Sequence, residues 1–301
     1  MRMKLLLLSL LAPLAAAAAP APAPAAAKAR APRPALWLLA DADTSIYLFG
    51  TTHILPATRK WRSPALERAI ASADELVMET ADGEAEPDEY EEEYFRPMML
   101  AAPSPVLTRV SAQRRPVLAR LIREAELEQE LLDSMQDWAV AVTLTVAQIE
   151  REYKQEGGGV SGAEEVLEGL FRKAGKPISG VETDAEQMGF LASVSPATQR
   201  AMLEDTVDEL ASGDLEGLEG DDEAWASGDV DAIAQGLKDS LPPEVYEVLL
   251  TRRNARWSDW LERRLDRPGT ILFAVGAGHL AGADSVQAML SARGLRVRRI
   301  D

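Results

Sequence analysis

The sequence contains no cysteine and only two histidines, His53 and His279, in 301 residues. Without cysteine there are no disulfide bonds, thiolate-ligated zinc sites, iron–sulfur clusters or cysteine nucleophiles. Any mechanism that needs an imidazole must use one or both of the two histidines.

Basic residues are also few relative to acidic ones. The chain has 32 lysines and arginines against 49 aspartates and glutamates, which gives a formal net charge of -17. Such a surface repels nucleic acids and anionic lipids, so we expect no nucleic-acid partner. Hydrophobic residues make up 47% of the chain and charged residues 27%, a composition typical of a folded protein with a well-buried core.

The first 34 residues have the composition of an export segment. Met1 to Lys4 is positively charged, and Leu5 to Ala19 is almost wholly apolar, about the length of a signal-peptide core and too short for a comfortable membrane span. Residues 20–34 are rich in alanine and proline, which favours an extended tether. We therefore predict a signal peptide over 1–19, a tether over 20–34, and a periplasmic or secreted protein with no integral membrane segment after cleavage. The oligomeric state stays open.

The segments that follow alternate between strand and helix patterns. Residues 35–40 and 45–50 predict a hairpin, and 75–79 predicts a third strand. Between them, Ser63 and Pro64 are typical of a helix start, with the helix running to about residue 73. The order strand, helix, strand predicts a βαβ unit with a parallel pair.

The middle of the chain is predicted to be helical. Residues 113–155 show apolar residues at helical spacing throughout and belong to a helical insertion at about 84–175. A second helical region, about 196–245, is strongly acidic, with twelve acidic and no basic residues between Glu204 and Asp231. Residues 178–182 predict a strand.

The C-terminal part predicts a helix at 245–265, a buried strand at 270–275, a helix at 283–293 and a last strand at 295–300. Taken together, residues 35–301 predict a single α/β domain. Its expected features are a two-half mixed sheet, histidine loops at strand ends, flanking helices and the helical insertion.

Both histidines end the same local pattern. Residues 46–54 read IYLFGTTHI and residues 272–280 read LFAVGAGHL, so each has an apolar strand, a glycine, two small residues and then the histidine. Ligands of α/β sheets bind beyond the carboxyl ends of the strands. We therefore expect both imidazoles to face one site.

Two glutamates also follow strands. Glu79 ends ELVME, and Glu182 ends ISGVE. Two histidines with one or two glutamates form a ligand set that suits manganese, cobalt, zinc or iron(II). Such an ion lowers the pKa of a bound water and polarises a carbonyl, and a glutamate off the metal serves as a general base. Hydrogen-bonding, salt-bridge and helix-capping roles are the alternatives for these residues.

On these residues the chain resembles the TraB/GumN (PrgY) family, whose animal relatives are the Tiki metalloproteases. The resemblance rests on LWLL, YLFGTTHIL (47–55), ELVMET (75–80), GKPISGVETDAEQ (175–187), LLTRRNARW (249–257) and FAVGAGHLAG (273–282) followed by RGLRV. It extends over nearly the whole mature chain. It implies a divalent-metal hydrolase with a two-half α/β fold, related to erythromycin esterases and haem-associated ChaN-like proteins.

The resemblance also implies roles for individual residues. His53 and His279 match the histidines of the family's two G-x-x-H motifs, and Glu79 matches its strand-end glutamate. These three are expected to hold the metal, with Glu79 also counted as catalytic. Glu182 matches the glutamate of the family's G-L-E-T segment and is expected to be a base or a supporting residue. Arg253 and Asn254 match an arginine–asparagine pair, in which the arginine is expected to stabilise an oxyanion or bind a substrate carboxylate.

One position departs from the family pattern. Ser161 follows Gly159 and Val160 where many members have an aspartate, so the expected carboxylate is missing. The function expected is an exported divalent-metal hydrolase, with a peptidase favoured, that uses metal-activated water on a peptide or small-molecule substrate. Two alternatives stay open: a periplasmic metal- or haem-binding protein without turnover, and a non-catalytic protein associated with envelope polysaccharide.

Overall fold

The computed structural model describes residues 33–53, 55, 59–81, 94–155, 161–212 and 223–301. The predicted signal peptide (1–19), residues 20–32 of the predicted tether and the first part of the predicted helical insertion lie outside these residues. Among the described helices, none is both long and apolar enough to cross a membrane.

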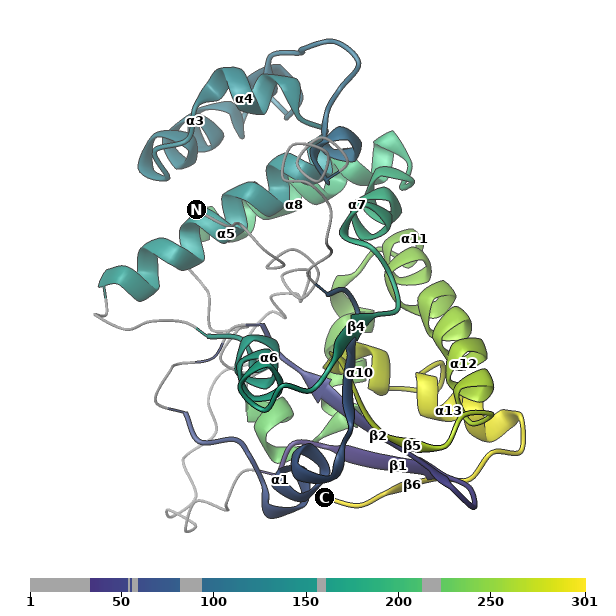
Figure 1. The fold of residues 1–301 in the computed structure, drawn as a ribbon. Coiled ribbons are helices and arrows are strands. Elements are labelled where there is room, and N and C mark those ends of the chain that lie inside the picture. Colours follow the sequence, from purple (N-terminus) through teal and green to yellow (C-terminus); the bar gives the residue numbers. More distant parts are fainter. Residues whose placement is uncertain (1–32, 54, 56–58, 82–93, 156–160, 213–222) are drawn as a thin grey trace, which may run out of the picture.

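The strands form one mixed, six-stranded sheet in the order β4-β3-β5-β2-β1-β6 (Figure 1). Their bounds are β1 Leu36–Ala40, β2 Thr44–Thr51, β3 Glu75–Met78, β4 Ile178–Gly180, β5 Gly269–Gly276 and β6 Val297–Arg299. β1 and β2 pair antiparallel, which confirms the predicted hairpin. β2, β3 and β4 run parallel to β5, and β6 pairs antiparallel with β1 at the edge. The α/β fold class is therefore confirmed.

The predicted βαβ unit is wrong in one respect. β2 and β3 are parallel, but they do not pair, because β5 from the C-terminal part of the chain lies between them. β5 is apolar on both faces, and a strand of that kind needs helices above and below it and neighbours on each side. The order of segments along the chain cannot reveal a strand that arrives almost 200 residues later.

Helices cover both faces of the sheet. α1 (Pro64–Ser72) and α6 (Ala163–Lys173) pack against one face, in a core that contains Phe49, Met78 and Leu272. α12 (Arg252–Arg264) and α13 (Val286–Ala292) pack against the other, in a core that contains Leu48, Val77 and Phe273. Ser63 caps α1 as predicted, since its hydroxyl accepts a hydrogen bond from the Leu66 backbone N–H at 3.2 Å.

A third core lies among helices beyond one end of the sheet (Figure 1). These helices are α3 (Arg115–Glu124), α4 (Gln129–Ser134), α5 (Asp137–Gln155), α7 (Asp184–Ala192) and α8 (Pro196–Ser212). α10 (Val230–Ser240) and α11 (Pro243–Tyr246) follow in the chain, and a π-helical turn, Glu247–Thr251, joins α11 to α12. The helix predicted over 245–265 is thus present, with a π turn inside it.

The prediction of continuous helix over 113–155 is wrong. The chain leaves helical geometry after α3, where Glu126 has a positive φ of 55°, and again between α4 and α5. At the second break the Arg109 guanidinium donates hydrogen bonds to the carbonyls of Leu132 and Met135, both at 2.6 Å. These bonds satisfy carbonyls that a helix end leaves without partners. Apolar periodicity persists on both sides of each break, so it does not reveal the breaks.

Candidate functional site

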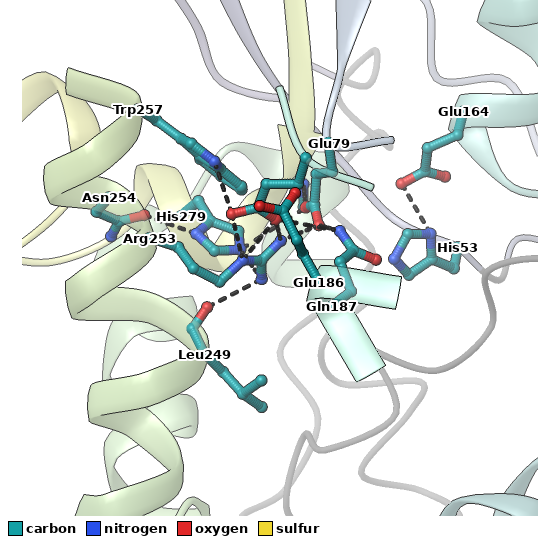
Figure 2. A network of polar contacts seen from close by, with 12 residues as sticks. His53, Glu79, Glu164, Glu186, Gln187, Leu249, Arg253, Asn254, Trp257 and His279 are labelled. Carbon is teal, nitrogen blue, oxygen red and sulfur yellow. Dashed lines mark hydrogen bonds and ion pairs between the residues drawn. The ribbon is translucent and has the colours of Figure 1, made fainter. Parts of the chain in front are cut away.

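The strand ends bring the predicted residues to one edge of the sheet. Thr51 at the end of β2 is in register with Gly276 at the end of β5, and β3 pairs along the other side of β5. His53 lies just beyond β2, and Glu79 directly follows β3. His279 lies in a short 3-10 helix, Ala277–Leu280, rather than in an open loop. Figure 2 shows Glu79 and His279 in one network of polar contacts, with His53 and Glu164 as a separate pair on the other side of Gln187.

Close packing explains the glycines of both motifs. A Cβ atom on Gly50 would lie 3.0 Å from the Cα of Ala277, so the two histidine segments touch each other there. A Cβ on Gly276 would lie 3.2 Å from Oε1 of Glu79. The Gly276 N–H donates to that same oxygen at 2.8 Å. Both glycines therefore allow another part of the site to approach the backbone.

His279 is buried and held in one tautomer. Its Nδ1 lies 2.6 Å from Oδ1 of Asn254, whose amide nitrogen donates to the carbonyl of Asp284 at 2.9 Å. Because that bond turns Oδ1 towards the ring, we assign the hydrogen to Nδ1 and the lone pair to Nε2. Burial, followed by the charge of Arg253, lowers the pKa of His279 to about 3, so the ring is neutral at neutral pH.

Glu79 is buried and ionised. It accepts hydrogen bonds from Arg253 Nη2 at 2.6 Å and from Gln187 Nε2 at 3.0 Å. Oε1 lies 3.7 Å from Nε2 of His279. Burial by itself raises the pKa of Glu79, but the charge of Arg253, with smaller contributions from His279, His53 and the Gly276 N–H, outweighs burial and lowers the pKa to about 2.

Arg253 joins the two glutamates. Its side chain is 1% exposed, and its guanidinium donates to Glu182 from Nε at 3.0 Å and from Nη2 at 2.8 Å. Nη1 donates to the π-turn carbonyl of Leu249 at 3.0 Å and lies 3.0 Å from Nε2 of His279. Although burial alone lowers the pKa of Arg253, the two glutamates raise it above its usual value. The guanidinium is therefore a fixed cation at the centre of the site.

Both oxygens of Glu182 are already occupied. Besides Arg253, the carboxylate accepts from Arg256 Nη2 at 2.6 Å and from the indole nitrogen of Trp257 at 3.0 Å. Of the two roles expected for Glu182, a general base or a supporting residue, this geometry favours the supporting one. The ring of Trp257 also lies 4.3 Å from that of His279 and 4.6 Å from the Arg253 guanidinium carbon.

His53 lies on the far side of Gln187 from His279 (Figure 2). Its Nδ1 is 2.9 Å from Oε1 of Glu164, in the first turn of α6. Burial alone lowers the pKa of His53, but Glu164 outweighs it and the pKa is raised above 6.5. Neither Glu164 nor Gln187 was predicted from the sequence as a site residue. Gln187 belongs to the GKPISGVETDAEQ segment, which could have pointed to it, whereas nothing in the sequence marks Glu164.

A model of the TraB/PrgY/gumN family matches residues 35–299. The chain belongs to the TraB/PrgY/gumN family. The matched region includes all six strands and both histidine motifs. No curated protein and no solved structure matches the chain. The relation to Tiki-type metalloproteases stays a prediction.

Within the described residues of this TraB/PrgY/gumN protein, no three histidine, aspartate or glutamate side chains converge as a metal-binding group. The Arg253 guanidinium contacts Nε2 of His279 through Nη1 and Oε2 of Glu79 through Nη2. The donors themselves fit an ion: a neutral imidazole nitrogen and an ionised carboxylate oxygen lie 3.7 Å apart, a span that bonds of about 2 Å can bridge. An ion at that place requires the guanidinium to move aside.

Ser161 lies beside the His53 segment. Its backbone N–H donates to the carbonyl of Leu55 at 3.2 Å, and its hydroxyl donates to Glu165 at 3.1 Å. Gly162 follows, and a Cβ there would lie 3.0 Å from the His53 carbonyl and 2.9 Å from Oε2 of Glu164. Gly162 thus lets the start of α6 approach the histidine.

A pair of glycine substitutions in this helix tests that approach. We expect Gly162→Ala to lower the free energy of unfolding by about 1–3 kcal/mol, because the methyl group overpacks against the His53 backbone. Gly169→Ala, inside the same helix with open space around it, is expected to stabilise by about 0.5–1 kcal/mol. Urea denaturation of both variants measures the difference. If the free energy of unfolding changed in the same direction in Gly162→Ala and Gly169→Ala, the close approach at Gly162 would be contradicted.

Proposed function

We propose that this protein is an exported, divalent-metal-dependent hydrolase, with peptidase activity favoured, whose ion is held by His53, Glu79 and His279. One observation carries the proposal. Each histidine has its Nδ1 beside a side-chain oxygen, from Glu164 for His53 and from Asn254 for His279, which leaves Nε2 as the donor atom. Metal-ligating histidines are typically held in this way by a second residue.

The remaining residues support hydrolysis. A divalent ion bound here supplies a water of lowered pKa and polarises a carbonyl. Glu79 stays ionised down to about pH 2 and so remains a carboxylate donor throughout the neutral range. Arg253 offers N–H donors to a substrate carboxylate or a developing oxyanion, and Glu182 holds it in position.

The test is metal titration and peptide hydrolysis on the purified mature protein. We expect one ion per chain when manganese, cobalt, zinc or iron(II) is added in turn, and cleavage of a fluorogenic peptide library with at least one of them. His53→Ala and His279→Ala are each expected to abolish both, with circular dichroism showing that the fold survives. Full hydrolysis by the double variant would refute the proposal.

One observation favours a second candidate, a non-catalytic envelope protein. The Arg253 guanidinium lies 3.0 Å from Nε2 of His279 and 2.6 Å from Oε2 of Glu79, so it already neutralises the site. If Arg253 keeps this place in solution, no divalent ion binds at these two donors. Absence of stoichiometric ion and of turnover in the same titration would favour this candidate, whereas an ion without turnover would favour a metal-binding protein.

A further inference from the structure

Glu164 is a buried carboxylate with few partners. Its side chain is 16% exposed, and His53 lies beside it, with Nδ1 2.9 Å from Oε1. Both carboxylate oxygens are buried, and within the described part of the chain neither has a hydrogen-bond partner of good geometry, so the contact with His53 is a close ion pair. Burying a carboxylate with an oxygen unsatisfied costs free energy. Stability alone therefore does not account for a glutamate at this position.

Two backbone hydrogen bonds tie the start of α6 to the His53 segment. The Ala163 N–H donates to the carbonyl of Thr52 at 2.8 Å, and the Ser161 N–H donates to that of Leu55 at 3.2 Å. These bonds lie on either side of His53 in the sequence. Together with the missing side chain of Gly162, they hold the Glu164 carboxylate against the ring.

The neighbouring glutamate behaves differently. Glu165 is exposed to solvent, and its carboxylate accepts from the Ser161 hydroxyl at 3.1 Å. Its adjacency to Glu164 in the same helical turn makes it a matched control, because both positions carry the same charge near the same helix end.

We propose that Glu164 positions His53, by accepting the Nδ1 hydrogen and so leaving Nε2 as the free donor atom. The proposal rests on the function proposed above, in which Nε2 of His53 is a metal donor. Since a carboxylate beside Nδ1 fixes the ring orientation and tautomer, Glu164 acts through His53 and not on the substrate.

The scarcity of histidine makes the test direct, because a spectrum of the ring nitrogens contains only two imidazoles. The spectrum is recorded on the metal-free protein at about pH 9, well above the ordinary imidazole pKa, to allow for the raised pKa of His53. In wild type, we expect the hydrogen of His53 on Nδ1. In Glu164→Ala, we expect it to shift towards Nε2, with the His279 signals unchanged. Glu165→Ala is expected to leave both rings as in wild type.

Metal affinity and thermal stability complete the test. We expect Glu164→Ala to weaken binding of the activating ion about 10- to 100-fold, with some loss of melting temperature because one partner of a close ion pair is removed.

An unchanged His53 tautomer in Glu164→Ala would overturn the positioning role, and so would a fall in melting temperature without any change in the ring. Failure of the proposed function has a different signature. If wild type binds no divalent ion, the hydrolase proposal fails, yet the ring spectra of the metal-free protein still decide whether Glu164 fixes His53.

Discussion

Replacing Arg253 with methionine is expected to lower the free energy of unfolding by about 3–5 kcal/mol, because it removes one partner from a buried ionic network. Methionine keeps much of the side-chain volume but none of the donors. Glu79 and Glu182 would then remain buried without the guanidinium that lies 2.6 and 2.8 Å from them. Chemical denaturation followed by circular dichroism measures the loss.

Arg256→Met is the matched control for this prediction. Arg256 also donates to Glu182, at 2.6 Å, but its side chain is 48% exposed. A pair with one solvent-exposed partner contributes little, so we expect a loss below about 1 kcal/mol. Equal losses in the two variants would contradict the view that burial of Arg253 makes its removal costly.

The second large effect is expected in the helices beyond the end of the sheet. Arg109→Met should cost about 3–5 kcal/mol, because Arg109 is 6% exposed and pairs with the buried Asp137 at 2.9 Å. The substitution also leaves the carbonyls of Leu132 and Met135 without the guanidinium that donates hydrogen bonds to them. Hydrogen exchange measures the protection of the backbone amides in each segment, and we expect the largest loss of protection in α4 and the start of α5.

Arg114→Met is the control on the same side of the molecule. Arg114 pairs with Glu204 and Asp208 of α8, but the Asp208 side chain is 56% exposed and the arginine itself is 29% exposed. We expect little change in the denaturation midpoint, because ion pairs between solvent-exposed side chains contribute little to stability. If Arg109→Met were equally mild, the break between α4 and α5 would not depend on the buried guanidinium.

Local signals predicted the elements of the sheet well. Ser63 with Pro64 marked the start of α1, and the apolar run at 270–275 marked β5. Neither signal says which strands pair. β5 separates β2 from β3 because a strand that is apolar on both faces is buried best in the interior of the sheet. Which strands become its neighbours depends on how all the strands pack together.

The site was predicted in part for a similar reason. Residues directly after strands, such as His53 and Glu79, follow from the rule that strand ends share one edge. Glu164 and Gln187 lie on helices, and their contacts depend on how α6 and α7 pack, which no repeat or spacing encodes. The place of Arg253 between His279 and Glu79 is likewise a result of packing, and it bears directly on how a metal would enter.

The π turn at Glu247–Thr251 has a consequence for insertions and deletions. A π turn accommodates one residue more than an α turn does, and each residue advances an α-helix by about 100° around its axis. Deleting one residue from the turn would therefore rotate α12 relative to α11, and Arg253 and Trp257 would no longer face the sheet edge. Substitutions in this turn should be tolerated more readily than any change in its length.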